Sequence, residues 1–165
     1  IAHVVTPETA EGSLISKDDG TIVGSRLVAQ AFNEPRYFWP RPSAAGYNAS
    51  AAAGSNKSPT SADLTERAQE LVGRYGATAQ NPLPTDLAAA SGGGLDPHIT
   101  ERAAVYQAAR VAQARGLAAS RVEALIAERA FAPGGVLTPD RIVNVLELNV
   151  ALDALGRPNS TSLER

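Results

Sequence analysis

The chain has 165 residues, a length typical of one domain, and a formal net charge of −2 with no block of like charges. This nearly balanced charge argues against a main role in binding nucleic acid or an anionic membrane surface. Since the sequence contains no cysteine and only two histidines, it excludes disulfides, cysteine nucleophiles and a metal site built from histidines alone.

The first elements predicted along the chain are a tether and a β-hairpin. Residues 1–11 contain a proline and show no regular period, so we expect them to form a tether. The β-favouring runs 13–15 and 21–23 flank Asp19-Gly20, and an Asp-Gly pair between two such runs is typical of a hairpin turn. The segment 26–32 that follows fits a short helix and a continuing strand equally well.

An aromatic and proline cluster comes next. The Tyr-Phe-Trp run at 37–39 lies between Pro35 and Pro42, and the prolines forbid a helix interior and favour extended backbone. Aromatic residues and arginine are enriched at interface hot spots, so the cluster is either a docking edge or part of the local core. Residues 43–59 are rich in Ala, Ser, Gly and Asn and are expected to form a long loop.

Four helices are predicted from apolar periodicity and from capping residues. Their expected ranges are 60–75, 100–115, 120–129 and 138–155, with Gly76 and Gly116 expected to end the first two. The expected starts of the first, third and last helix are Thr60, Ser120 and Thr138-Pro139. The side chains expected to be buried are Leu64, Ala68, Leu71, Val72 and Tyr75 in the first helix, Val122, Leu125 and Ile126 in the third, and Ile142, Val145, Leu146, Leu148 and Leu152 in the last.

Together these elements predict an α+β fold, a single compact domain of several helices with a small sheet formed mainly near the N-terminus. We expect the domain to span residues 12–155, and residues 156–165 to form a polar C-terminal tail. No apolar run reaches the roughly 18 to 20 residues needed to span a bilayer. Because the chain begins at Ile1 and not at a methionine, we expect that an upstream segment has been removed.

The glycine run Ser91, Gly92, Gly93 and Gly94 precedes a predicted helix. Backbone N–H groups that converge at a helix N-terminus can cradle a phosphate, so the run is a candidate nucleotide loop. It matches neither the Walker loop nor the dinucleotide-binding pattern. A tight turn that leads the backbone into the helix is the plainer interpretation.

Asp96 and His98 are spaced so that a carboxylate can lie beside an imidazole, which suits acid–base catalysis. The structural alternative is that Asp96 accepts backbone N–H bonds at the helix entrance, which the following proline stiffens. A free-standing secreted hydrolase or binding protein using Ser91, Asp96 and His98 is the alternative function, although no nucleophile elbow is present. Asn144 and Asn149 interrupt the apolar last helix, and their partners lie either inside the fold or on another protein.

A series of short blocks runs along the chain from Gly12 to Asp153. The two least common are Arg41-Pro42-Ser43-Ala44 and Gly94-Leu95-Asp96-Pro97-His98-Ile99. The others are Gly12-Ser13-Leu14-Ile15, Gly24-Ser25, Gln30-Ala31-Phe32, Tyr37-Phe38, Tyr47-Asn48, Gly54-Ser55-Asn56, Pro84-Thr85-Asp86-Leu87, Ala90-Ser91-Gly92, Arg110-Val111-Ala112 and Val143-Asn144-Val145-Leu146-Glu147-Leu148-Asn149. In this order the blocks resemble the KdpC family, the C subunit of the Kdp-type potassium-transporting ATPase. Trp39-Pro40 departs from the small polar pair that is usual before the Arg-Pro-Ser-Ala block.

The resemblance implies a non-catalytic subunit of an ATP-driven potassium uptake pump. Such a subunit helps assembly and acts as a catalytic chaperone that raises the ATP affinity of the P-type ATPase subunit. The implied partners are that ATPase subunit and the channel-like potassium-translocating subunit. Since this chain has no Asp-Lys-Thr-Gly signature, it cannot itself form the aspartyl-phosphate of a P-type pump. If this chain binds ATP directly, the loop Ser91–Gly94 is the expected site.

Members of this family carry an N-terminal transmembrane helix just before the region with which this chain begins, so residues 1–11 would follow a removed span. The resemblance therefore implies single-pass attachment to the plasma membrane of a bacterium, with the soluble domain on the extracytoplasmic side. Since ATP is cytoplasmic, a domain on the exterior would lie on the opposite side of the membrane from it. Such a domain would hold subunits together or gate the mouth of the potassium pathway. It would change the nucleotide affinity of the pump only through the other subunits.

Overall fold

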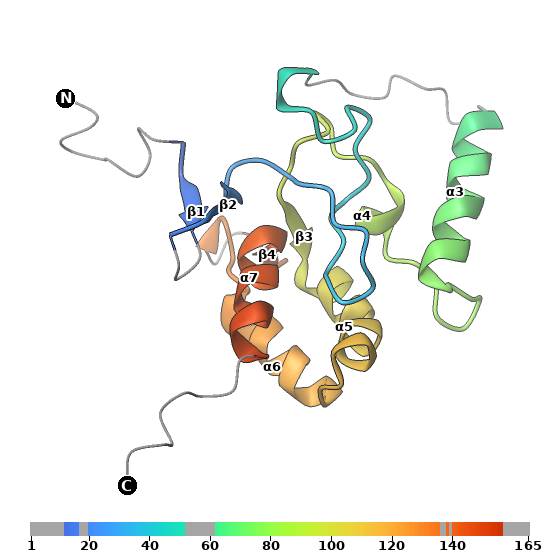
Figure 1. Ribbon diagram of the computed structural model, residues 1–165. Coiled ribbons are helices and arrows are strands. Elements are labelled where there is room, and N and C mark those ends of the chain that lie inside the picture. The colour runs from blue at the N-terminus through green and yellow to red at the C-terminus, as the bar shows by residue number, and fades with distance from the viewer. Residues whose placement is uncertain (1–11, 17–19, 52–61, 136–137, 139, 157–165) are drawn as a thin grey trace, which may run out of the picture.

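Five α-helices and two small antiparallel sheets make up the described part of the chain, which covers residues 12–16, 20–51, 62–135, 138 and 140–156 of a computed structural model (Figure 1). The elements are β1 (Leu14–Ser16), β2 (Ile22–Ser25), the short 3-10 helix η1 (Ala49–Ala51), α3 (Ala62–Tyr75), α4 (Thr85–Ala88), β3 (His98–Thr100), α5 (Glu101–Arg115), α6 (Ala119–Arg129), β4 (Ile142–Asn144) and α7 (Val145–Leu155). None of the described helices is long and apolar enough to cross a membrane. The mixture of helices and strands confirms the predicted α+β class.

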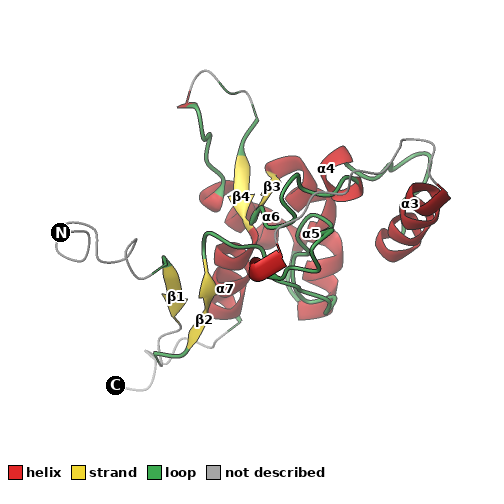
Figure 2. Cartoon of the chain, turned by 90° about the horizontal axis from the view of Figure 1, so that it is seen from above, coloured by secondary structure: helices red, strands yellow, loops and turns green. Residues whose placement is uncertain are grey.

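Strands β1 and β2 form the predicted N-terminal hairpin. They are antiparallel, with Ile15 opposite Gly24, and the register is irregular between Ile15 and Ser16. The turn that the Asp19-Gly20 pair predicts lies partly outside the described residues, since Asp19 is not among them. Figure 2 shows the hairpin beside α7, on the side of the molecule away from α3.

The segment 26–32 is neither a helix nor a strand. The Arg26 N–H donates to the Ser13 carbonyl at 3.0 Å, directly beyond the Leu14–Ser25 pair, and so closes the end of the hairpin. The Ala29 N–H donates to the distant Leu95 carbonyl at 2.9 Å. Because a distant partner satisfies the Ala29 N–H, a local helix is not needed to pair it.

The second sheet, β3–β4, is absent from the sequence-based prediction. It is antiparallel and pairs Ile99 with Val143, both of them buried. β3 runs directly into α5, because the side chain of Thr100 accepts the Ala103 N–H at 3.1 Å and caps the helix. The glycine run at 91–94 therefore leads into a strand and not into a helix.

Helix α7 begins at Val145, so the predicted start at Thr138-Pro139 is wrong. Residues 142–144 pair with β3 as a strand, which suits the β-branched side chains at 142 and 143. The helix can begin only after that strand, where the side chain of Asn144 accepts the Glu147 N–H at 3.2 Å as an N-cap. Pro139 lies outside the described residues.

The core lies where α5, α6 and α7 pack together (Figure 1). α5 contributes four buried alanines, whose small side chains let the other helices approach closely. The larger fully buried aliphatic side chains in this region are Val111, Val122, Ile126, Leu148 and Leu152. The prediction is confirmed for the buried face of the third helix and for residues 145, 146, 148 and 152 of the last. α5 also ends as predicted, at Gly116 in the left-handed conformation.

The N-cap of helix α6 lies two residues before the predicted capping residue, Ser120. The N-cap is Ala118, which makes no side-chain cap bond, and Ser120 lies inside the first turn. The short link from α5 explains this start, since the Leu117 N–H donates to the Ala112 carbonyl at 2.9 Å and completes the end of α5. Ala118 alone is then left to turn the chain into α6.

Helix α3 stands at the edge of the molecule and contacts it mainly through its C-terminal turn (Figures 1 and 2). Leu71 is buried, and the Arg74 guanidinium lies 4.2 Å from the centroid of the Trp39 ring. The predicted buried face is wrong for Ala68 and Val72, which are exposed, Val72 by 46%. The core is already covered by α5–α7 and the aromatic segment, so α3 has little apolar surface to cover.

Two buried side-chain amides hold the aromatic segment 37–39 against α5 and α7. The Asn149 Oδ1 accepts the Phe38 N–H at 2.8 Å, and its Nδ2 donates to the Phe38 carbonyl at 3.0 Å. Gln107 repeats the pattern on Trp39, with bonds of 2.9 and 3.1 Å. Phe38 and Trp39 are both buried, so the core-packing interpretation of the aromatic cluster is correct for them. We call these four bonds the amide clamp.

Arginines from α5 support the clamped segment. The Arg110 Nη1 donates to the Tyr37 carbonyl at 3.0 Å, and the guanidinium lies 3.6 Å from the centroid of the Trp39 ring. Burial lowers the pKa of Arg110 to about 10, so the group stays charged at neutral pH. The Arg115 Nη2 donates to Asp153 Oδ1 at 2.8 Å and ties α5 to α7.

Replacing either clamp residue is expected to destabilise the fold. Gln107→Leu or Asn149→Leu would leave one buried N–H and one buried carbonyl unpaired, which we expect to lower the free energy of unfolding by about 2 to 4 kcal/mol. Gln113→Leu is the matched control on the exposed side of α5 and should change it by less than about 0.5 kcal/mol. Urea unfolding measures all three, and losses under about 1 kcal/mol for both clamp variants would contradict the clamp's role.

Candidate functional site

The candidate nucleotide loop, Ser91 to Gly94, lies between α4 and β3 and packs on the loop that begins at Ser43. Ser91 is buried, and its N–H donates to the Pro42 carbonyl at 3.3 Å. The Gly94 N–H closes a turn on the Ser91 carbonyl at 3.1 Å, and the Ser43 hydroxyl donates to the Gly94 carbonyl. The fold thus uses two of the four backbone N–H groups of the run, and the exposed Gly92 and Gly93 carry the other two.

Gly94 is the position in this run where only glycine fits. Its φ is +71°, and an added Cβ would lie 3.0 Å from Ser43 Oγ and 3.1 Å from both the Cβ and the backbone nitrogen of Ala45. A side chain at Gly94 would therefore meet backbone as well as the Ser43 hydroxyl. Gly92 and Gly93 have no atom within 4 Å of such a Cβ, so the exposed tip of the loop has room around it.

Arg41 bonds to the residues on either side of this loop and places a positive charge beside it. Its Nη2 donates to the Ala90 carbonyl at 3.3 Å, and its Nη1 donates to Asp96 Oδ2, also at 3.3 Å. Its Nε is buried and has no partner among the described residues. The guanidinium thus holds the two ends of the loop together. Because it is already paired with a carboxylate, the pair is neutral overall and attracts an added anion less than an unpaired arginine would.

Asp96 and His98 lie side by side, as their spacing predicts. The Asp96 Oδ1 accepts the His98 N–H at 3.0 Å and lies 3.3 Å from the ring Nδ1. The hydrogen bond from His98 is the main cause that lowers the pKa of the Asp96 carboxyl, against the opposing effect of its partial burial. The expectation of a helix entrance is wrong here, because Asp96 bonds to the first residue of β3.

The described contacts do not extend this pair to a catalytic triad. The His98 ring also contacts Phe131, edge to face with ring centroids 5.7 Å apart. No serine hydroxyl within the described residues makes a hydrogen bond to His98, and Ser91 is only 3% exposed. The Asp96–His98 pair therefore joins the glycine loop to the 131 region, and the alternative hydrolase finds no assembled nucleophile there.

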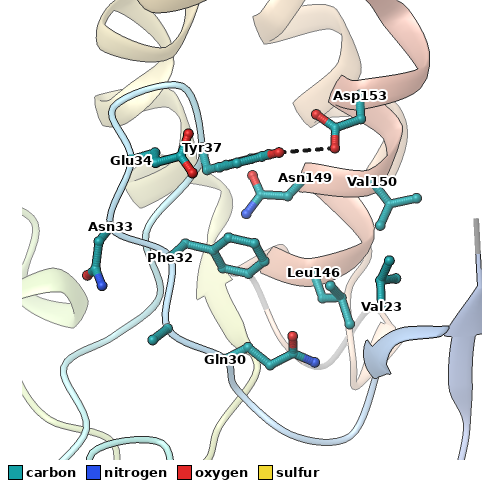
Figure 3. Close-up of a pocket in the computed structure, with 11 residues that line it drawn as sticks. Val23, Gln30, Phe32, Asn33, Glu34, Tyr37, Leu146, Asn149, Val150 and Asp153 are labelled. Atoms are coloured by element: carbon teal, nitrogen blue, oxygen red, sulfur yellow. Dashed lines mark hydrogen bonds between the residues drawn. The ribbon is translucent and has the colours of Figure 1, made fainter. Parts of the chain in front are cut away.

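A separate pocket of about 430 Å³ lies between α7 and the segment 30–37 (Figure 3). Phe32, Leu146 and Val150 supply apolar surface, and the Tyr37 hydroxyl donates to Asp153 Oδ2 at 3.2 Å on one wall. Burial, followed by the negative charge of Asp153, raises the pKa of the Tyr37 phenol. The wall facing the clamp is closed by the amide of Asn149, which is already bonded to Phe38.

The sequence analysis predicts no pocket here, although it singles out three of the lining residues, Tyr37, Leu146 and Asn149. The sequence analysis names Asn149 as a polar residue in an apolar helix and leaves the place of its partner open. In the structure that partner is the backbone of Phe38, inside the fold. The same is true of Asn144, whose Nδ2 donates to the Arg26 carbonyl at 2.7 Å. Gln107 and Arg110 give no comparable signal, because polar residues are ordinary in a helix with the charge pattern of α5.

Comparison with known proteins gives one consistent result. The family model described as "KdpC: K+-transporting ATPase, c chain" matches residues 1–154. The chain is 68% identical over 153 residues to the potassium-transporting ATPase KdpC subunit of Parvibaculum lavamentivorans, an alignment that covers 93% of this chain and 82% of the relative. It is 49% identical over 166 residues to the protein of the same name from Methylococcus capsulatus, which covers 94% and 84% of the two chains.

The chain therefore belongs to the KdpC family, the c chain of the K+-transporting ATPase. This confirms the resemblance stated from the sequence blocks. As a c chain it is an accessory subunit of a potassium pump and not an enzyme by itself. The Asp96–His98 pair is accordingly interpreted as part of the loop architecture.

The lowered pKa of Asp96 predicts a specific pH dependence of stability. A carboxyl with a depressed folded-state pKa stabilises the fold above its ordinary value of about 3.9, and this contribution is lost as the pH falls through the folded-state pKa. We expect Asp96→Asn to be less stable than the wild type at about pH 6, and the gap to close towards about pH 2.5. The effect should be modest, because the side chain is partly exposed and screened by solvent.

Thermal unfolding across this range measures the gap, with Asp140→Asn as the control. Asp140 is an exposed carboxylate with no ion pair to another described residue, so its replacement should leave the pH profile of the wild type unchanged. A gap for Asp96→Asn that has the same size at both ends of the range would show that the aspartate acts by shape and not by its charge.

Proposed function

We propose that this chain is the subunit that helps the potassium pump assemble and acts as a catalytic chaperone, raising the ATP affinity of the P-type ATPase subunit. The observation that carries the proposal is the family match across residues 1–154. Its partners are the P-type ATPase subunit and the channel-like potassium-translocating subunit. The absence of an Asp-Lys-Thr-Gly signature from the sequence is consistent with a role beside the phosphorylated subunit.

The membrane arrangement that goes with this role is a single N-terminal span upstream of residue 1, with the described domain on the extracytoplasmic side of a bacterial plasma membrane. In this arrangement the domain holds subunits together or gates the mouth of the potassium pathway. It then changes ATP affinity through the other subunits, because the nucleotide lies on the opposite side of the membrane.

The geometry of the glycine loop supports an indirect effect on nucleotide. A phosphate cradle needs several converging N–H groups and an available cation. The Ser91–Gly94 loop offers the N–H groups of Gly92 and Gly93, and the neighbouring Arg41 is paired with Asp96. For direct binding of ATP by this chain, the Ser91–Gly94 loop is the proposed site, and we propose no other nucleotide site.

The role is tested by the ATP dependence of the assembled pump. Potassium-stimulated ATP hydrolysis is measured at increasing ATP, with the complex purified in the presence or absence of this chain. We expect removal of the chain to raise the KM for ATP several-fold while kcat changes less, since the catalytic groups lie on another subunit. An unchanged KM in a complex that remains otherwise intact would contradict the chaperone role.

Direct binding is tested on the chain alone, by following backbone amide resonances during a Mg-ATP titration. We expect no saturable shifts at residues 91–98, because the loop presents few free donors. Saturable shifts confined to that loop, and absent with Mg²⁺ alone, would show that the chain has its own nucleotide site. The extracytoplasmic placement would then be contradicted.

A further inference from the structure

A long groove runs along the outer face of α7, from the N-terminal hairpin to the link between α5 and α6. It consists of two open pockets, of about 760 Å³ between α6 and α7 and about 480 Å³ beside β1. The two pockets share three lining residues, Arg129, Ala151 and Ala154, so they are parts of one surface. Figure 1 shows α7 beside α6, on the side of the molecule where the hairpin lies.

The floor of this α7 groove is apolar and partly made of small side chains. Ala151 and Ala154 lie one turn apart on α7, and the partly exposed Leu117 and Leu155 line the end beside α6, above the buried Leu125. Small residues let another backbone come close to the helix, while the leucines provide apolar surface that a bound segment would cover. The floor thus suits a segment of protein with one apolar face.

The rim of the groove carries an excess of positive charge. Its charged lining residues are Arg26, Arg115, Arg121 and Arg129 against Glu128 and Glu147. The Arg115 side chain is buried and paired with Asp153, so the other three arginines and the two glutamates leave one positive charge on this surface, whereas the whole chain has a net charge of −2. The exposed charge of the groove is therefore opposite in sign to the net charge of the chain.

Two of these arginines are available to a partner. Arg115 is committed to Asp153, and Arg26 is paired with Glu147 at 3.7 Å. Arg121 has no carboxylate within ion-pair distance among the described residues. Arg129 faces only its sequence neighbour Glu128, at 3.6 Å, and both side chains are well exposed, by 46% and 68%, so this pair contributes little.

We propose that the α7 groove binds an acidic amphipathic segment of another subunit of the same pump. Arg121 and Arg129 are eight residues apart on α6, about 12 Å along the helix axis. The matching segment carries two carboxylates at a similar spacing, beside an apolar face that covers the alanines and leucines of the floor. The proposal rests on the proposed function, because it takes the partner from the assembled complex.

The test is retention of this chain in the detergent-solubilised pump. The double variant Arg121→Glu, Arg129→Glu places negative charge against the partner's carboxylates, and we expect it to weaken retention by about tenfold or more. The variant with lysine at both positions keeps the charge and should be retained nearly as well as the wild type. Arg102→Glu, an exposed arginine on α5, is the matched control and should have no effect.

Salt and folding controls keep the result interpretable. Retention of the wild type should fall as ionic strength rises, and the charge-reversed variant should lose this salt dependence. All variants should unfold at the temperature of the wild type, since neither arginine packs in the core. A charge-reversed variant that is retained as well as the wild type, with the same salt dependence, would overturn the proposal.

Two further outcomes separate this proposal from its alternatives. If the wild-type chain itself does not co-purify with the pump, the proposed function fails and this inference fails with it. A second experiment measures how well the wild type and the charge-reversed variant bind to vesicles that contain anionic lipid. If the charge-reversed variant is retained by the pump but loses binding to these vesicles, the groove recognises lipid headgroups and the protein partner is wrong.

Discussion

Two neutral side-chain amides, buried between α5 and α7, fix the path of the aromatic segment 37–39 across this domain. Gln107 and Asn149 bond to the backbone of Trp39 and Phe38 at both the N–H and the carbonyl. These four polar groups have no access to water, so leaving them unpaired would be costly. A slip of one residue would also move Phe38 out of the core, and the clamp therefore sets the register as well as the position of the segment.

Contacts on either side of the clamp carry its effect to the rest of the structure. Arg74 stacks on the Trp39 ring and holds the end of α3, which has few other contacts with the core. The Tyr37 hydroxyl reaches Asp153 and forms a wall of the pocket beside α7. Two residues beyond Trp39, Arg41 joins the start and the end of the glycine loop. One extended segment thus organises α3, α7 and the candidate nucleotide loop.

Local signals in the sequence predict the elements whose causes are local. The Asp-Gly pair predicts the hairpin, and Gly116 predicts the end of α5, because turn and cap chemistry acts within a few residues. The β3–β4 sheet is missed because two three-residue strands meet only when distant parts of the chain pack together. Gln107 and Asn149 are 68 and 111 residues from their partners in sequence, so their roles follow from the fold. The resemblance to the family rests on the ordered series of blocks, of which Arg-Pro-Ser-Ala and Gly-Leu-Asp-Pro-His-Ile are the least common, and the second of these runs from the glycine loop into β3.

The clamp is tested most directly by hydrogen exchange of the two amides it binds, those of Phe38 and Trp39. If the clamp holds the segment as part of the core, both amides exchange only when the whole domain unfolds, with a protection that equals the global free energy of unfolding. Their protection should then match that of buried amides in α5. If Phe38 and Trp39 exchange much faster than those α5 amides, the segment opens locally, and the clamp does not govern the fold.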